Sequence, residues 1–139
     1  MTDLWPDAET GEMITDGTVL SFEAASTITK GDLVYLSADM TVSKCTAITQ
    51  HALGVALTTV QSGEYCSVCT QGVVKVTAGD AINRGEDVQT DADANVIALA
   101  DGSASYDQTE IPDRIARTVG VALQTFASGD TGLIHVTKA

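Results

Sequence analysis

The sequence predicts an all-β fold: a small antiparallel β-barrel or sandwich that is built from two diverged repeats and carries an extended N-terminal arm. Glycines and polar clusters interrupt the chain about every ten residues, as they do in sandwiches and small barrels. Apolar and polar side chains alternate, for example in Val74, Lys75, Val76 and Thr77, which is the period of a strand. In addition, several short segments occur twice, in the same order.

The duplication is clearest in two pairs of segments. Residues 30–34 (KGDLV) recur as residues 84–88 (RGEDV), at an offset of 54, and residues 53–57 (LGVAL) recur as residues 119–123 (VGVAL), at an offset of 66. The second copy therefore has 12 more residues than the first between these segments. The insertion falls in the polar stretch of residues 101–114, which we expect to be a surface loop.

Each copy predicts the same series of elements. A basic-Gly-acidic turn leads into a short apolar strand, and a polar turn follows at residues 37–40 and again at 91–94. Another strand comes next, then a longer strand rich in Val, Ala and Leu. A Ser-Gly-acidic turn, at residues 62–64 and 128–130, precedes the final strand. Two units favour a closed barrel, in which no sheet edge is exposed, over a solenoid, which needs at least three.

The chain length of 139 residues suits one domain. We expect residues 1–16 to form the N-terminal arm and residues 17–139 to form a single β domain. Within that domain, repeat one covers about residues 28–77 and repeat two about residues 82–137.

The chain is strongly acidic, with 19 Asp and Glu against 7 Lys and Arg and a net charge of -12. A duplex-binding surface needs clustered Lys and Arg, and an anionic membrane attracts basic segments, so we expect neither nucleic acid nor membrane as a direct partner. The acidity fits either solubility through self-repulsion or a high-salt habitat. The apolar runs are too short for a transmembrane helix, and residues 1–16 lack the features of a secretory signal.

Cys66 and Cys69 have the spacing of a redox motif or half of a zinc site. In a β-alternating run, however, positions three apart face opposite sides of the strand, and tetrahedral zinc needs two further ligands. We expect both to be small packing residues. With only three cysteines in the chain, a disulfide framework is not expected.

Asp91, Asp93 and Asn95 start like a calcium loop of the EF-hand type, but the sixth position is Val96 instead of glycine. A hairpin turn is the better interpretation of this segment.

The histidines, His51 and His135, have no nucleophile or carboxylate at a catalytic spacing. The sequence therefore predicts no catalytic residue, no metal site and no cofactor.

The only tryptophan, Trp5, lies between Leu4 and Pro6 in the polar N-terminal segment. An apolar Leu-Trp-Pro unit in a polar tail indicates docking, either on a partner or back on the chain's own barrel. We take Leu4, Trp5 and Pro6 as the candidate binding residues.

Several runs resemble the capsid cement family of tailed viruses, which are small head-decoration proteins. The resemblance covers about residues 17–137 and is carried by residues 28–34 (ITKGDLV), 52–57 (ALGVAL), 68–74 (VCTQGVV), 117–123 (RTVGVAL) and 128–136 (SGDTGLIHV). It implies a β-barrel or sandwich made in the host cytoplasm and placed on the outer capsid surface as a homotrimer. It also implies that the trimer clamps hexamers of the major capsid protein, and that an N-terminal arm, here residues 1–16, reaches onto the shell.

Three other functions stay open at this point. A small-molecule-binding β-barrel would have an apolar pocket with convergent polar groups. An enzyme built around Cys66 and Cys69 would have a thiol of depressed pKa. A tail-tube or fibre domain would be a different structural part of the virion.

Overall fold

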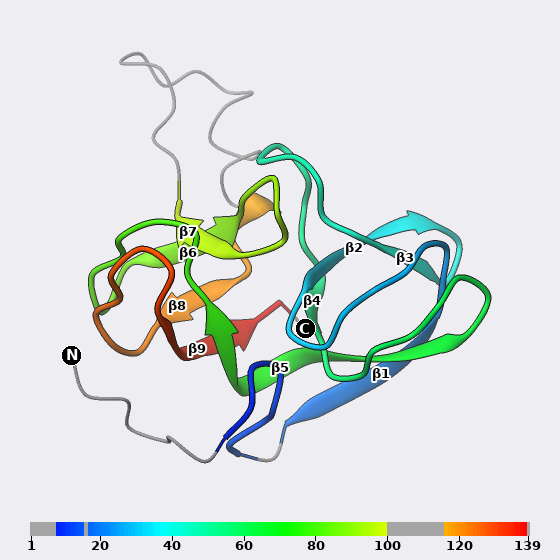
Figure 1. Ribbon diagram of the computed structural model, residues 1–139, viewed down its shortest axis with the longest axis horizontal. Helices are drawn as coiled ribbons and strands as arrows, with labels where there is room; N and C mark the ends of the chain where they lie inside the picture. The colour runs from blue at the N-terminus through cyan, green and yellow to red at the C-terminus, as the bar shows by residue number, and fades with distance from the viewer. Residues whose placement is uncertain (1–7, 16, 100–115, 139) are drawn as a thin grey trace.

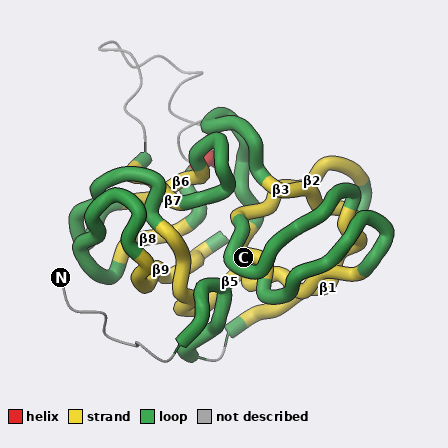
Figure 2. Tube along the Cα trace, viewed as in Figure 1, coloured by secondary structure: helices red, strands yellow, loops and turns green. Residues whose placement is uncertain are grey.

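The computed structural model describes residues 8–15, 17–99 and 116–138, and it confirms the all-β fold (Figure 1). Within these residues, nine strands form one hydrogen-bonded sheet, which Figure 2 shows in yellow. The strands are β1 (Thr18–Ala24), β2 (Leu33–Ala38), β3 (Thr41–Lys44), β4 (Gly54–Ala56), β5 (Tyr65–Thr77), β6 (Asp87–Thr90), β7 (Val96–Ala98), β8 (Gly120–Ala122) and β9 (Thr131–Thr137). The expected loop at residues 101–114 lies outside the described residues.

The first part of the chain, residues 18–71, folds into a closed five-stranded barrel that we call unit one. Its strands follow the order β1-β3-β2-β4-β5, and β5 pairs back onto β1. The β1–β3 pairing is parallel and the others are antiparallel. Closure leaves this barrel without a free sheet edge.

The second part, residues 72–137, repeats the arrangement and is called unit two. The C-terminal half of β5 takes the place of β1, and β7, β6, β8 and β9 take the places of β3, β2, β4 and β5. A parallel bridge between Ala78 and Val96 closes this unit. It is equivalent to the parallel pair Ala24–Val42 of unit one. Figure 1 shows the two units side by side, with β5 running from one to the other.

The strand registers of the two units agree residue by residue at the offsets of 54 and 66. Leu33 lies opposite Val55 in unit one, and the equivalent Asp87 lies opposite Val121 in unit two. The structural repeat thus includes β1, which matches residues 72–78. Further equivalent pairs are Val55–Cys69 with Val121–His135, Leu20–Val68 with Val74–Ile134, and Ile28–Val60 with Ile82–Phe126.

The polar turns predicted at residues 37–40 and 91–94 join β2 to β3 and β6 to β7. Each ends on a residue with positive φ, Met40 at 48° and Ala94 at 62°. This left-handed conformation lets the chain reverse direction within four residues, and it costs a side-chain-bearing residue some strain.

Two groups of buried side chains form the interior. One fills unit one and contains Phe22, Ala24, Ile28, Val34, Val42, Ala56, Val60, Cys66 and Val68. The other fills unit two and extends to five residues of unit one that point out of its barrel: Leu33, Cys45, Ala52, Val55 and Cys69. The two units are therefore joined by a continuous apolar core.

The contact between the units also includes polar groups. The backbone N–H of Leu33 donates to the carbonyl oxygen of Ala94 at 3.0 Å. The side-chain amide of Gln89 donates to the carbonyl oxygen of Ile48 at 2.9 Å. We call this contact between the two units of one chain the joint.

Candidate interaction surfaces

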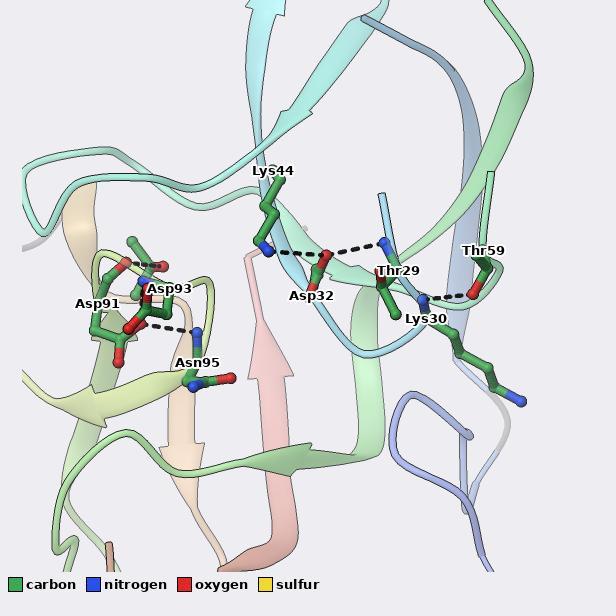
Figure 3. Close-up of polar contacts among 9 residues, drawn as sticks. Thr29, Lys30, Asp32, Lys44, Thr59, Asp91, Asp93 and Asn95 are labelled. Carbon is green, nitrogen blue, oxygen red and sulfur yellow. Dashed lines mark hydrogen bonds and ion pairs between the residues drawn. The ribbon is translucent and has the colours of Figure 1, made fainter. Parts of the chain in front are cut away.

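The basic-Gly-acidic motif closes equivalent turns in the two units. The Asp32 Oδ2 atom accepts the backbone N–H of Thr29 at 2.9 Å and lies 4.0 Å from the Nζ atom of Lys44 (Figure 3). In unit two, Glu86 Oε1 accepts the backbone N–H of Asn83 at 2.7 Å. Burial raises the pKa of Asp32, because desolvation outweighs the hydrogen bond from Thr29 and the charge of Lys44. The carboxylates of this motif therefore stabilise the two turns by accepting backbone N–H groups.

The structure places Cys66 and Cys69 on opposite faces of β5. Cys66 points into the interior of unit one, and Cys69 belongs to the joint. Burial raises the pKa of both thiols, and it raises the pKa of Cys45 from 9.0 to about 12. A protonated, buried thiol is a poor nucleophile and a poor metal ligand, so these residues act as packing residues.

The Asp91 segment forms the hairpin turn between β6 and β7. Asp91 Oδ1 accepts the backbone N–H groups of Asp93 and Asn95 at 2.8 and 2.9 Å (Figure 3). An aspartate that bonds to the backbone two residues ahead is a common turn device. Within residues 8–15, 17–99 and 116–138, no three His, Cys, Asp or Glu side chains are grouped so that they could hold a metal ion.

His51 and Lys138 both line an open hollow of about 550 Å³ between the two units. The Lys138 ammonium donates to the carbonyl oxygen of Ala116 and, at 3.3 Å, to that of Thr118. Burial lowers the pKa of Lys138. These bonds tie the end of β9 to the segment before β8. His135 lies on β9, on the outer face of unit two.

The N-terminal segment lies along the C-terminal half of β5. The backbone N–H of Gly11 donates to the carbonyl oxygen of Lys75 at 2.6 Å, and the N–H of Ile14 donates to that of Val73 at 2.8 Å. The Lys75 side chain is 3% exposed and donates to the carbonyl oxygen of Ala8 at 3.2 Å. Residues 8–14 are thus attached to unit two. Leu4, Trp5 and Pro6 lie outside the described residues, and their role stays a prediction.

Unit one carries an apolar surface that the sequence analysis missed. Leu20, Leu36 and Met40 are 44%, 50% and 65% exposed at one end of its barrel. We call this end the mouth of unit one. The comparison of the repeats contained a signal for it, because Thr90 and Ala94 stand where unit one has Leu36 and Met40.

No helix within the part of the chain that the structure describes is long and apolar enough to cross a membrane.

Comparison with known proteins identified a family and a similar solved structure. A family model described as phage cement protein matches residues 14–138. The chain is also similar to the crystal structure of the N base of head fiber gp8.5 in bacteriophage phi29. The two share 18% sequence identity, with a TM-score of 0.58, over 88% of this chain and 95% of that chain. At this identity the likeness shows a shared fold. Comparison with curated proteins gave no match.

Proposed function

The chain belongs to the phage cement protein family, and on that basis we propose that it decorates and stabilises the outer surface of an icosahedral capsid, as trimers that bridge hexamers of the major capsid protein. The family match over residues 14–138 is the observation that carries this proposal. Membership makes the chain a structural protein of the virion that associates with capsid components. The trimeric state, the bridging of hexamers and the position on the outer capsid surface are what our proposal adds to family membership.

Physical reasoning supports such a role for a small rigid body. A trimer that engages three sites gains avidity without new kinds of contact. Because the cement binds the assembled shell better than its separate parts, mass action stabilises the shell. The net charge of -12 keeps free subunits soluble and disfavours direct contact with nucleic acid.

We also propose that the protein catalyses no reaction. The side chains that resembled reactive groups have other tasks in the fold: the thiols are buried, and Asp91 holds a turn. Within the described residues, the interior of each unit is filled mainly by packed apolar side chains, which supports this proposal.

The N-terminal arm is our candidate for direct contact with the shell, through Leu4, Trp5 and Pro6. Its support is the attachment of residues 8–14 to β5, which fixes the position of residue 8, to which the candidate segment is joined. An apolar segment that starts from a fixed point loses less freedom on docking than one on a free tail.

Deletion of residues 1–7 tests the arm without disturbing residues 8–14. We expect a folded protein with an unchanged melting temperature that binds empty shells at least ten-fold more weakly in a co-sedimentation assay. A full-length Trp5→Ala variant should show part of the same loss. Undiminished binding would remove the arm from the mechanism, whereas a full chain that does not bind shells would refute the cement function itself.

A second candidate is the base of a fibre on the head, which the fold shared with the phi29 head fiber N base favours. Electron microscopy of the source particles distinguishes the two. Low protrusions at three-fold positions support a cement, and long appendages that rise from the same positions support a fibre base.

A further inference from the structure

The two units expose different surfaces at equivalent positions. The mouth of unit one consists of Leu20, Leu36 and Met40, and an open hollow lies beside Leu36 and Met40. The equivalent mouth of unit two consists of Val74, Thr90 and Ala94, all of which are fully buried. The same structural position is therefore covered in one unit and open in the other.

Unit one covers the mouth of unit two at the joint. The N–H of Leu33 bonds to the carbonyl oxygen of Ala94, and the thiol of Cys45 interacts with Thr90. Val74 belongs to the same apolar group as Leu33, Val55 and Cys69. These last three residues lie in one row across β2, β4 and β5, which we call the side of unit one.

The side of unit two is the equivalent row across β6, β8 and β9, formed by Asp87, Val121 and His135. Its members are exposed or partly exposed, and Leu123 beside them is 46% exposed. Another open hollow lies at Asp87 and Lys138. Within the residues that the structure describes, each chain therefore has one open mouth and one open side, the two halves of a contact that it already makes once internally.

We propose that the mouth of unit one in one chain packs against the side of unit two in the next chain, as the mouth of unit two packs against the side of unit one within each chain. Met40 then takes the place of Ala94, and Asp87 takes the place of Leu33. The partner is a second copy of this protein.

Such a contact is heterologous, because it joins two different surfaces, and repetition must give either a ring or a filament. The hollow between the two units favours a ring. It is lined by Tyr35 and Leu36 of unit one and by Ala116 and Lys138, which lie next to the side of unit two. The open mouth and the neighbourhood of the open side therefore border one hollow instead of lying at opposite ends of the chain. The number of chains in the ring is the one part of this inference that rests on the proposed function: three chains, which contain six units.

The chemistry of the two surfaces fits a contact weaker than the joint. The mouth supplies three apolar side chains, and exposed Asp39 lies next to Met40 on the same hairpin. The hollow on the receiving side contains the cation Lys138 near Asp87. Asp87 and His135 replace Leu33 and Cys69, so the surface is more polar than its counterpart in the joint. A chain that must also stay soluble on its own requires such a surface.

The Leu36→Asp and Val121→Asp variants test the mouth and the side separately. Sedimentation of the wild type over a concentration series in moderate salt, which screens the repulsion between acidic subunits, should show trimers of the 14.4 kDa chain. Each variant should associate at least ten-fold more weakly, because the new carboxylate must be desolvated in the contact. Tyr65→Asp changes another exposed residue, outside both surfaces and the joint, and should leave association unchanged.

Mixing the two variants gives the sharpest outcome. Leu36→Asp keeps an intact side and Val121→Asp keeps an intact mouth, so the mixture should form one-to-one dimers and nothing larger. A wild type that stays monomeric at every concentration, variants that assemble like Tyr65→Asp, or a mixture that does not pair would each overturn the proposal. A wild type that binds shells and yet shows one of these results would refute this contact alone, and leave the cement function standing.

A Met40→Cys/Asp87→Cys variant provides a second measurement that does not depend on tolerance of a buried charge. The equivalent residues Ala94 and Leu33 share a backbone hydrogen bond, so the new thiols should lie within disulfide distance across the contact. The native cysteines are buried. Oxidation should give covalent dimers and closed trimers, whereas either single variant should give no more than dimers. If the oxidised double variant showed no covalent dimers and trimers on a non-reducing gel, the proposed contact would be contradicted.

Discussion

At the scale of single residues, the two interiors fill equivalent space with different side chains. Unit one has Phe22, Val60 and Cys66 at three interior positions, and unit two has Val76, Phe126 and Gly132 at the equivalent ones. The phenylalanine occupies the first of these positions in unit one and the second in unit two. The third position has a cysteine in unit one and a glycine in unit two. A Cβ atom at Gly132 would lie 2.3 Å from the Phe126 ring, so the glycine makes room for that ring.

Gly132→Ala should therefore destabilise the protein by about 2 kcal/mol, because the added methyl group overpacks a filled interior. Urea unfolding followed by circular dichroism measures the loss. The triple variant Val76→Phe/Phe126→Val/Gly132→Cys, which copies the interior of unit one into unit two, should recover much of it. If Gly132→Ala cost no stability, or if the triple variant were less stable than Gly132→Ala, the idea that Gly132 makes room for the Phe126 ring would be refuted.

At the scale of elements, β5 performs two tasks in one strand. Its residues 65–71 occupy the place that β9 has in unit two, and residues 72–77 occupy the place that β1 has in unit one. The change falls at Gly72, whose φ is 143°, and the pairing with β1 shifts register just before it. A glycine at this point lets one strand leave the first barrel and enter the second.

Gly72→Ala should cost more stability than Gly63→Ala. Both glycines have positive φ, but Gly63 has open space around it, whereas a Cβ at Gly72 would lie 2.9 Å from the terminal methyl group of Met13. We expect a loss of about 1 kcal/mol at Gly63 from backbone strain and about 2 kcal/mol at Gly72. Thermal unfolding measures both. A double-mutant cycle with Met13→Ala should show favourable coupling, and independent effects would mean that crowding plays no part.

At the scale of the whole molecule, the apolar core that runs from unit two into the joint makes the two units one cooperative folding unit. Unit two contributes its mouth to this core, and unit one contributes its side. The shared strand β5 adds a covalent connection, because it forms part of the wall of both barrels. Because the core of unit two continues across the joint into unit one, and β5 belongs to both barrels, we expect both units to unfold together in one cooperative transition.

Matched substitutions test this cooperativity. Val68→Ala and Ile134→Ala remove buried side chains at equivalent positions of the two units, at a cost of about 2 to 4 kcal/mol each. In differential scanning calorimetry, each should lower the temperature of one common transition, while Tyr65→Ala at the surface should not. Two separate transitions, one sensitive to each substitution, would contradict a single folding body.

The sequence by itself determined the fold class, the duplication and the turns. These depend on local signals: alternation along a strand, the positions of glycine, and the return of the same short segments. Residues 30–34 and 84–88 predicted equivalent turns and strands, and the structure confirms the equivalence down to the register. The role of Leu4, Trp5 and Pro6 stays a prediction.

Only the tertiary structure decided which of two equivalent residues is buried. Leu33 is fully buried and its counterpart Asp87 is exposed, although both stand at the same place in the same turn and strand. Burial of an outward-facing side chain depends on what packs against it, and a repeat read along the chain does not say which copy lies next to which surface. The sharing of β5 has the same origin, because a strand acquires two roles only when two barrels close around it.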